Sequence, residues 1–374
     1  MKTKTKASIQ NIIFLSIYMI SFIAAGGVMG KGINEVEKIA GHDLNLLQII
    51  LPITLFFVLY LLSYLLQMYL HECGHVLFGG LSGYKFSSIR FGSIIFVKTE
   101  NGIKVKKYKM GGTGGQAIMT APDCDPLKLP TFLYNMGGVF VNLFLSFIFL
   151  LLYFVFPGAN VFFRSFSLMM FFMGLGIALT NGLPFTELGV DGGNTLIFQK
   201  SPEARLYFRN SFLLVDQLAK GISIKDLDPA LYAFDWNTPL DNMHISGGAI
   251  QNLSIKEMNN DFSGILEKTD FLLEKNTSLH PIHKSQLISM KIFAMIMTSA
   301  PQDDITAFYK NNLKDLKRGA TLLDYQRRMY AYCKKVEGNE KKAAKFKTAF
   351  EQIAKSYPYP TEVDTERELM ALVE

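Results

Sequence analysis

The chain has 374 residues and a formal net charge of +6, and it is 49% hydrophobic but still 19% charged. Its positive mean hydropathy of +0.20 indicates a membrane protein, whereas the charged fraction is too high for a bundle of membrane spans alone. The three cysteines form no CxxC pair and no even set, which argues against a disulfide framework. Apolar stretches dominate up to about residue 200 and charges recur beyond it, so we expect a membrane domain at 1–200 and a soluble α-helical domain at 201–374.

Four segments are apolar and long enough to cross a bilayer as helices, at about residues 11–30, 49–75, 131–156 and 161–180. Basic residues gather between the second and third of them: Lys85, Arg90, Lys98, Lys104, Lys106, Lys107, Lys109 and Lys128. The other two connections between spans are poor in Lys and Arg. By the positive-inside rule, we expect a multi-pass protein of the cell membrane with both termini in the cytoplasm.

The second span ends in His71-Glu72-Cys73-Gly74-His75. On a helix this spacing places His71 and His75 on one face, where both can bind one zinc ion, and leaves Glu72 beside the metal-bound water. Ionisable residues in a membrane segment are costly to insert and are functional by default. The alternative is a set of polar residues at a helix end that reach toward the interface.

Between the second and third spans we expect a β-hairpin over about residues 86–110. Two strand-like runs, 86–97 and 103–110, flank Asn101-Gly102, which is a strong turn signal. The hairpin could add a strand of substrate at its edge, or it could lie with its lysines on anionic lipid, and both interpretations stay open. The glycine-rich run at 111–115 is interpreted as a flexible connector.

Two histidines do not complete a zinc site, because a catalytic zinc usually has a third protein ligand and leaves its fourth position to water. The fourth span returns to the side of the two histidines and is followed by Asp191-Gly192-Gly193. Pro184 should end the helix, and the two glycines should let the backbone bring a carboxylate to the metal and restart a helix at Asn194. Asp191 is therefore the predicted ligand and Glu187 the competing carboxylate, whereas an ordinary turn is the alternative.

From about residue 202 the chain predicts successive amphipathic helices, for example at 262–275, 283–297, 322–336 and 340–356. The last two resemble a helical hairpin of the tetratricopeptide type, although no 34-residue period is present. Arrays of such hairpins usually bind peptides or proteins, so a protein partner is one expectation and a compact helical domain without a partner is the other. His244, His280 and His283 show no metal-like grouping and are expected at the surface.

Together these motifs resemble the site-2 protease family of intramembrane zinc metalloproteases. That family has HExxH in one transmembrane helix, Gly-Pro-x-x-Asn in the next, and Asn-x-x-Pro leading to Asp-Gly-Gly in the one after. Here the first motif is intact, and the second is similar to residues 138–142, with Val139 in the proline position. The third is similar to Asn181, Pro184 and Asp191-Gly192-Gly193, with about two extra residues between Pro and Asp. The resemblance covers about residues 45–200.

The resemblance implies an intramembrane zinc metalloendopeptidase that cleaves a membrane-spanning segment or hydrophobic leader peptide near the cytoplasmic face. One Zn²⁺ held by His71, His75 and Asp191 would activate water, and Glu72 would carry its proton to the leaving amine. Asn142, by the same resemblance, would donate a hydrogen bond to the substrate backbone or to the developing oxyanion. The expected partners are a membrane-anchored protein or peptide substrate and the lipid bilayer, with no nucleic acid.

Three other functions are weighed against this one. A prenyl-peptide-processing zinc protease also uses HExxH but takes a Glu as third ligand, and the four spans with Asp-Gly-Gly argue against it. A non-catalytic membrane scaffold would have no use for Glu72 as a general base. A transporter is disfavoured because the sequence lacks paired broken spans in two halves.

Overall fold

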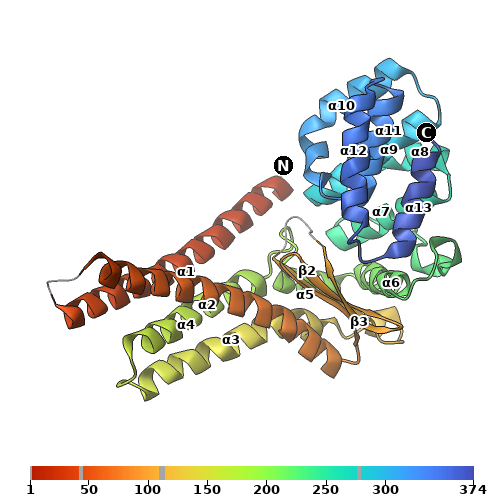
Figure 1. Ribbon diagram of the computed structural model, residues 1–374. Coiled ribbons are helices and arrows are strands. Elements are labelled where there is room, and N and C mark those ends of the chain that lie inside the picture. The colour runs from red at the N-terminus through yellow and green to blue at the C-terminus, as the bar shows by residue number, and fades with distance from the viewer. Residues whose placement is uncertain (1, 42–44, 109–113, 276–278) are drawn as a thin grey trace. The chain divides into compact units, whose positions relative to one another are not determined.

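The computed structural model describes the chain except residues 1, 42–44, 109–113 and 276–278 (Figure 1). The chain folds as two compact units, each made of two segments. The first unit comprises Met1–Gly83 and Pro130–Lys200, and the second comprises Tyr84–Leu129 and Ser201–Glu374. The boundary expected near residue 200 is present. However, the strands between the second and third long helices, which we had placed in the membrane domain, form one unit with the carboxy-terminal helices.

Four helices of the first unit are long and apolar enough to cross a membrane, judged by length and composition. Each contains or nearly coincides with a predicted span. Their bounds are α1 Lys2–Ala40, α2 Leu46–Leu81, α3 Thr131–Val155 and α4 Val161–Gly182. A capping box starts α2, in which the side chain of Asn45 accepts from the Gln48 N–H and the Gln48 side chain accepts from the Asn45 N–H. The chain is therefore a membrane protein by the character of these helices.

Helix α4 lies at the centre of this unit and packs against α1, α2 and α3. Its most apolar window is 50% buried, compared with 6% for α1 and 11% for α2. The contact between α2 and α4 is centred on a cluster of buried side chains that includes Phe56, Met169 and Met173. Large apolar side chains cover the outer faces of α1 and α2, with Ile23 66% and Leu51 63% exposed, as expected for surfaces that contact lipid rather than water.

The described strands form one antiparallel sheet in the order β3-β2-β1-β4. Their bounds are β1 Lys85–Phe91, β2 Ile94–Thr99, β3 Gly102–Lys107 and β4 Gly115–Thr120. The predicted hairpin corresponds to β2 and β3, but its two-residue turn is Glu100-Asn101, because Thr99 and Gly102 already pair across the two strands. The expected first strand, 86–97, is in fact two strands, because Gly92 adopts a φ of +57° and reverses the chain there. Residues 111–113 of the expected connector lie outside the described residues, as do residues 109–110 of the expected second strand, and Gly115 already belongs to β4.

The sheet belongs with the carboxy-terminal helices because one of its faces is part of their core. Ile95 and Val97 of β2 are buried in a cluster with Leu214 and Leu218 of α6, Pro202–Ala219. At the outer edge of the sheet, the hydroxyl of Thr120 donates to Asp216 of the same helix over 2.7 Å. Contacts between residues about a hundred positions apart thus decide to which unit the sheet belongs.

The remaining helices of the second unit follow α6 along the chain. They are α7 Met243–Met258, α8 Phe262–Lys275, α9 Pro281–Met297, α10 Gln302–Leu316, α11 Leu323–Lys335, α12 Glu340–Ala354 and α13 Pro360–Ala371. Short 3₁₀ helices lie at Pro126–Lys128, Ile224–Asp226, Pro229–Leu231 and Lys317–Gly319. The four helices predicted as examples correspond to α8, α9, α11 and α12. Whether α11 and α12 bind a partner as a tetratricopeptide-type pair stays a prediction.

A fully buried ion network ties three of these helices together. Arg328 of α11 donates to both carboxylate oxygens of Glu257 in α7, over 3.0 and 2.5 Å. The neighbouring Arg327 donates to Glu366 of α13 over 2.5 Å. Because an unpaired charge at such a site would be costly, the network fixes which faces of α7, α11 and α13 meet.

Two histidines expected at the surface are half-buried, and their rings lie largely out of contact with water. Burial lowers the pKa of His244 to about 3 and that of His283 to about 4, because the charged imidazolium would lose its hydration. The expectation was wrong because their environment is formed by packing between α7 and α9, which sequence spacing does not report. Both side chains are therefore neutral at physiological pH.

Candidate metal centre

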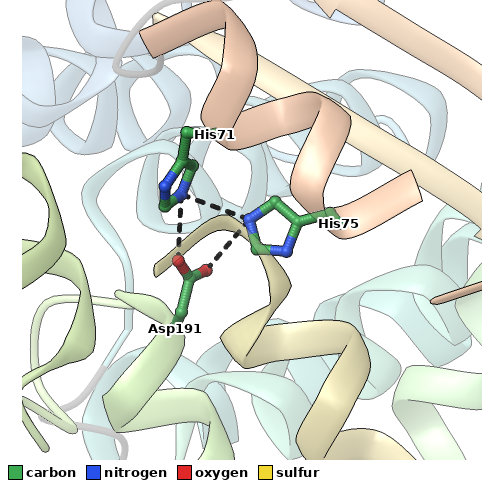
Figure 2. A group of neighbouring side chains, drawn as sticks. All are labelled: His71, His75 and Asp191. Carbon is green, nitrogen blue, oxygen red and sulfur yellow. Dashed lines mark hydrogen bonds and ion pairs between the residues drawn. The ribbon is translucent and has the colours of Figure 1, made fainter. Parts of the chain in front are cut away.

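His71, His75 and Asp191 come together inside the first unit, and Figure 2 shows their side chains pointing toward one another. The Nε2 atoms of the two histidines are 3.2 Å apart. Oδ2 of Asp191 lies 3.0 Å from Nε2 of His71, and Oδ1 lies 3.6 Å from Nε2 of His75. Both histidines are less than 9% exposed. The structure thus assembles the three side chains that the sequence singled out as ligands.

The hydrogen bonds of His75 fix which of its ring nitrogens carries the proton. Nδ1 lies 2.8 Å from the backbone carbonyl oxygen of Tyr134 in α3. A carbonyl oxygen can only accept, so Nδ1 donates and Nε2 of the neutral ring keeps its lone pair. That lone pair faces His71 and Asp191.

His71 has the same tautomer for a different reason. Its Nδ1 lies 2.6 Å from Oδ1 of Asn142 in α3. The amide nitrogen of Asn142 donates to the backbone oxygen and to the side-chain oxygen of Gln67, each over 2.8 Å. Because Asn142 must turn its nitrogen toward Gln67, its oxygen faces His71, so Nδ1 donates and Nε2 again presents a lone pair.

The three side chains could hold a metal ion, and the spacing of their donor atoms is compatible with zinc. Two lone pairs and a carboxylate converge, and Oδ2 of Asp191 is buried without a hydrogen-bond partner. Zinc with bonds of about 2.0–2.1 Å in tetrahedral geometry separates its ligand atoms by about 3.3 Å, close to the 3.0 and 3.2 Å observed between the donor atoms. Two imidazoles and one carboxylate also leave a fourth position for water.

The position of Asp191 depends on how tightly the preceding loop curls over the start of α5, Asp191–Lys200. Helix α4 ends at Gly182, and Leu183 is extended before Pro184 as expected for a residue that precedes proline. A Cβ at Gly192 would lie 2.1 Å from the carbonyl oxygen of Gly182, and one at Gly193 would lie 2.4 Å from that of Phe185. Only glycine fits at these two positions. The helix begins at Asp191 itself rather than at Asn194, which corrects our prediction.

Glu187, the competing carboxylate, is held away from the two histidines. Its Oε1 pairs with Nζ of Lys6 in α1 at 3.3 Å. Its backbone N–H donates to the side-chain oxygen of Gln10 over 3.1 Å, and Gln10 is only 8% exposed. Helix α1 therefore anchors the loop that leads to Asp191, and Glu187 is used in that anchor.

Close packing between α2 and α3 brings the two sides of the site together. A Cβ at Gly74, between the two histidines in sequence, would lie 2.5 Å from the carbonyl oxygen of Gly137. The two backbones meet there because neither residue has a side chain, an arrangement common between membrane helices. Glu72 is also buried on this part of α2, at 9% exposure, whereas Cys73 is exposed.

Asn142 is bonded to protein partners in this structure, and its hydrogen bond to a substrate stays a prediction. Its side chain is completely buried and both of its amide hydrogens are directed at Gln67, so in this arrangement it orients His71 instead of donating to a substrate. Sequence reasoning missed Gln67 altogether. The available signal was a single amide residue inside an otherwise apolar span, one helical turn before His71.

Comparisons of the chain with family models, with curated proteins and with solved structures gave no match. The likeness to the site-2 proteases therefore rests on the three motifs and on the order in which the helices carry them.

Proposed function

We propose that the chain is an intramembrane zinc metalloendopeptidase of the site-2 protease type. The observation that carries the proposal is the convergence of two Nε2 lone pairs and an unpartnered carboxylate oxygen within one set of apolar helices. A carboxylate with one buried oxygen that faces imidazole lone pairs is poorly satisfied by itself and well satisfied by a cation. The motif order across α2, α3 and α4 supports the same conclusion.

In this proposal Nε2 of His71, Nε2 of His75 and the carboxylate of Asp191 would hold the zinc. When bound, zinc lowers the pKa of its water toward neutrality and polarises a substrate carbonyl. Glu72 would take the proton from the attacking water and return it to the leaving amide nitrogen, which makes it the general base and then the general acid. Tyr134 and Asn142 would keep both imidazoles in the tautomer that leaves Nε2 available.

The substrate class follows from the setting of the site. The ligands lie in and beside helices with apolar outer faces, so a substrate that reaches them would be a membrane-spanning segment or a hydrophobic leader peptide. Such a segment must unwind locally, because a helix hides its carbonyl groups in hydrogen bonds. With the basic residues between α2 and α3 on the cytoplasmic side, cleavage would occur near that face and both termini would be cytoplasmic.

We also propose that the sheet rests on the membrane surface. Cross-strand pairs place Ile94, Phe96, Ile103, Val105, Lys98 and Lys107 on the face opposite the buried Ile95 and Val97. Ile103 and Val105 are 62% and 61% exposed, and both lysines are exposed. Exposed apolar residues beside cations suit anionic lipid, and β1 begins only a few residues after the membrane helix α2 ends.

The main proposal is tested by measuring the zinc content and the peptide cleavage of the same preparations. The full chain in lipid nanodiscs should contain about one zinc per chain and should cleave a hydrophobic transmembrane peptide. Glu72→Gln should retain zinc and lose cleavage, whereas His75→Ala should lose both. The wild type without bound zinc, or Glu72→Gln with full cleavage, would contradict the proposal.

A further inference from the structure

A chain of buried amide groups crosses three helices and ends on a metal-ligating histidine. Nε2 of Gln67 in α2 donates to the carbonyl oxygen of Met170 in α4 over 2.9 Å. Its Oε1 accepts from Nδ2 of Asn142 over 2.8 Å, and Oδ1 of Asn142 accepts from Nδ1 of His71 over 2.6 Å. Gln67 and Asn142 are both 0% exposed. We propose that Gln67 is a positioning residue that sets the tautomer of His71, an inference that rests on the proposed metal site.

Each amide group in this series of hydrogen bonds can adopt only one orientation. The carbonyl of Met170 accepts only, so Gln67 must turn its nitrogen toward α4 and its oxygen toward Asn142. Asn142 must then turn its nitrogen toward Gln67, which leaves its oxygen for His71. A backbone carbonyl in α4 thus determines, through two amides, that Nδ1 of His71 carries the proton.

The alternative orientation would disable a ligand. If the amide of Asn142 were reversed, its nitrogen would face Nδ1 of His71, which would then have to accept. The proton of the neutral ring would move to Nε2, and that nitrogen could no longer bind a metal. Groups that hold a ligating histidine in this way typically contribute 10- to 100-fold to metal affinity.

Loss of the Gln67 side chain should weaken metal binding by an amount at the low end of that 10- to 100-fold range. The backbone oxygen of Gln67 also accepts from Asn142, so one of the two contacts that orient the amide would remain. The site is tightly packed, since a Cβ at Gly174 of α4 would lie 2.4 Å from Nε2 of Gln67. Methionine, which has a similar shape but no amide, is therefore the appropriate replacement, and Gln67→Leu is a second choice if Gln67→Met does not fold.

The experiment uses the full chain in nanodiscs with ¹⁵N-labelled histidine. In metal-free protein at alkaline pH, the ¹⁵N shifts of His71 report its tautomer, and His71→Ala identifies its signals. Zinc affinity is measured by competition with a chelator. Gln67→Met should give a mixture of His71 tautomers and about tenfold weaker zinc binding. Gln67→Glu, whose carboxyl group still presents an acceptor oxygen to Asn142, should keep the His71 tautomer of the wild type.

A compensating substitution separates orientation from packing. A carboxyl group presents an oxygen to Nδ1 whichever way it faces, so Asn142→Asp should remove the need for Gln67. The double variant Gln67→Met with Asn142→Asp should therefore bind zinc at least as tightly as Asn142→Asp alone, in which Oε1 of Gln67 would face a carboxylate oxygen instead of a donor. An unchanged His71 tautomer in Gln67→Met, or equal weakening by Gln67→Met in both backgrounds, would overturn the proposal. Because the tautomer is read without metal, this result stays informative even if the protein has no protease activity.

Discussion

Gly138 of α3 lies directly against the imidazole of His71 in α2. A Cβ at Gly138 would stand 2.6 Å from Cε1 and Nδ1 of the ring, closer than carbon atoms approach. A side chain here would have to displace the ring whose other nitrogen faces Asp191.

Gly138→Ala is therefore expected to weaken zinc binding by at least about tenfold, because the ring and its bond to Asn142 must both shift. Chelator competition with zinc measures the change. Gly80→Ala in α2 is the matched control, since a Cβ there meets no atom within 4 Å. Equal zinc affinity in both variants would mean that the two helices separate easily and that their packing does not set the site.

Asp191 and Glu187 should differ sharply in their effect on metal content. Asp191→Asn removes the charge that faces the two Nε2 atoms, so zinc affinity should fall by more than about a hundredfold. Glu187→Gln loses an ion pair with the exposed Lys6 and should change zinc content little. Metal analysis of the two purified variants distinguishes them, and the reverse order would show that the loop before α5 is arranged differently.

Stability should depend on pH through Glu362 of α13. Burial, followed by repulsion from Glu366, raises the pKa of Glu362 to about 8 from an ordinary value of 4.5. Between these two values the folded chain keeps the proton that the unfolded chain has released, so raising the pH through this window favours unfolding. Glu362→Gln should make the unfolding temperature less dependent on pH there and should be the more stable form above pH 8.

The control for this measurement is Glu368→Gln, a substitution at an exposed position of the same helix. It should leave the pH dependence of the wild type unchanged. If the unfolding temperature of Glu362→Gln depends on pH in the same way as that of Glu368→Gln, the proton on Glu362 makes no contribution to folding stability.

Contact between the sheet and lipid can be measured with one fluorophore. The chain has a single tryptophan, Trp236, so Ile103→Trp in a Trp236→Phe background carries its only indole on the exposed face of β3. Brominated anionic lipids should quench this indole strongly. Lys104→Trp, one residue along and on the opposite face of the strand, should be quenched much less. Equal quenching at the two positions would contradict the proposed orientation of the sheet.

Local sequence patterns predicted the features that depend on neighbouring residues alone, namely the long helices and the shared face of the two histidines. Uninterrupted apolar runs gave the four long helices, and the spacing of His71 and His75 gave their shared helical face. The continuous strand over 86–97 was wrong because the β-forming residues on both sides hid the reversal at Gly92. A short-range pattern contains no information about which unit a strand will join.

The hydrogen bonds that orient the site residues could not be predicted from the sequence, for a related reason. Asn142 was noticed because a motif pointed to it, and its assigned role assumed a substrate as partner. Its actual partners, Gln67 and His71, lie more than 70 residues away in sequence, and only the packing of α3 on α2 brings them together. The third ligand was predicted because the membrane returns successive spans to the same side, which limits where Asp191 can arrive.

The division of the second unit into two chain segments determines the order in which the protein can be completed during synthesis. The sheet leaves the ribosome before α3 and α4, yet the side chains that cover Ile95 and Val97 come from Leu214, Leu218 and Tyr359. Until those residues are made, the sheet exposes two apolar faces, and such surfaces are prone to aggregation or chaperone binding. Asp191 is synthesised near the middle of the chain, after the helix that carries His71 and His75. A nascent chain therefore has all three candidate metal ligands once Asp191 is made, whereas the cover of its sheet is complete only when Tyr359 follows. A chain that stops between these two residues would have the candidate metal ligands but an incompletely covered sheet.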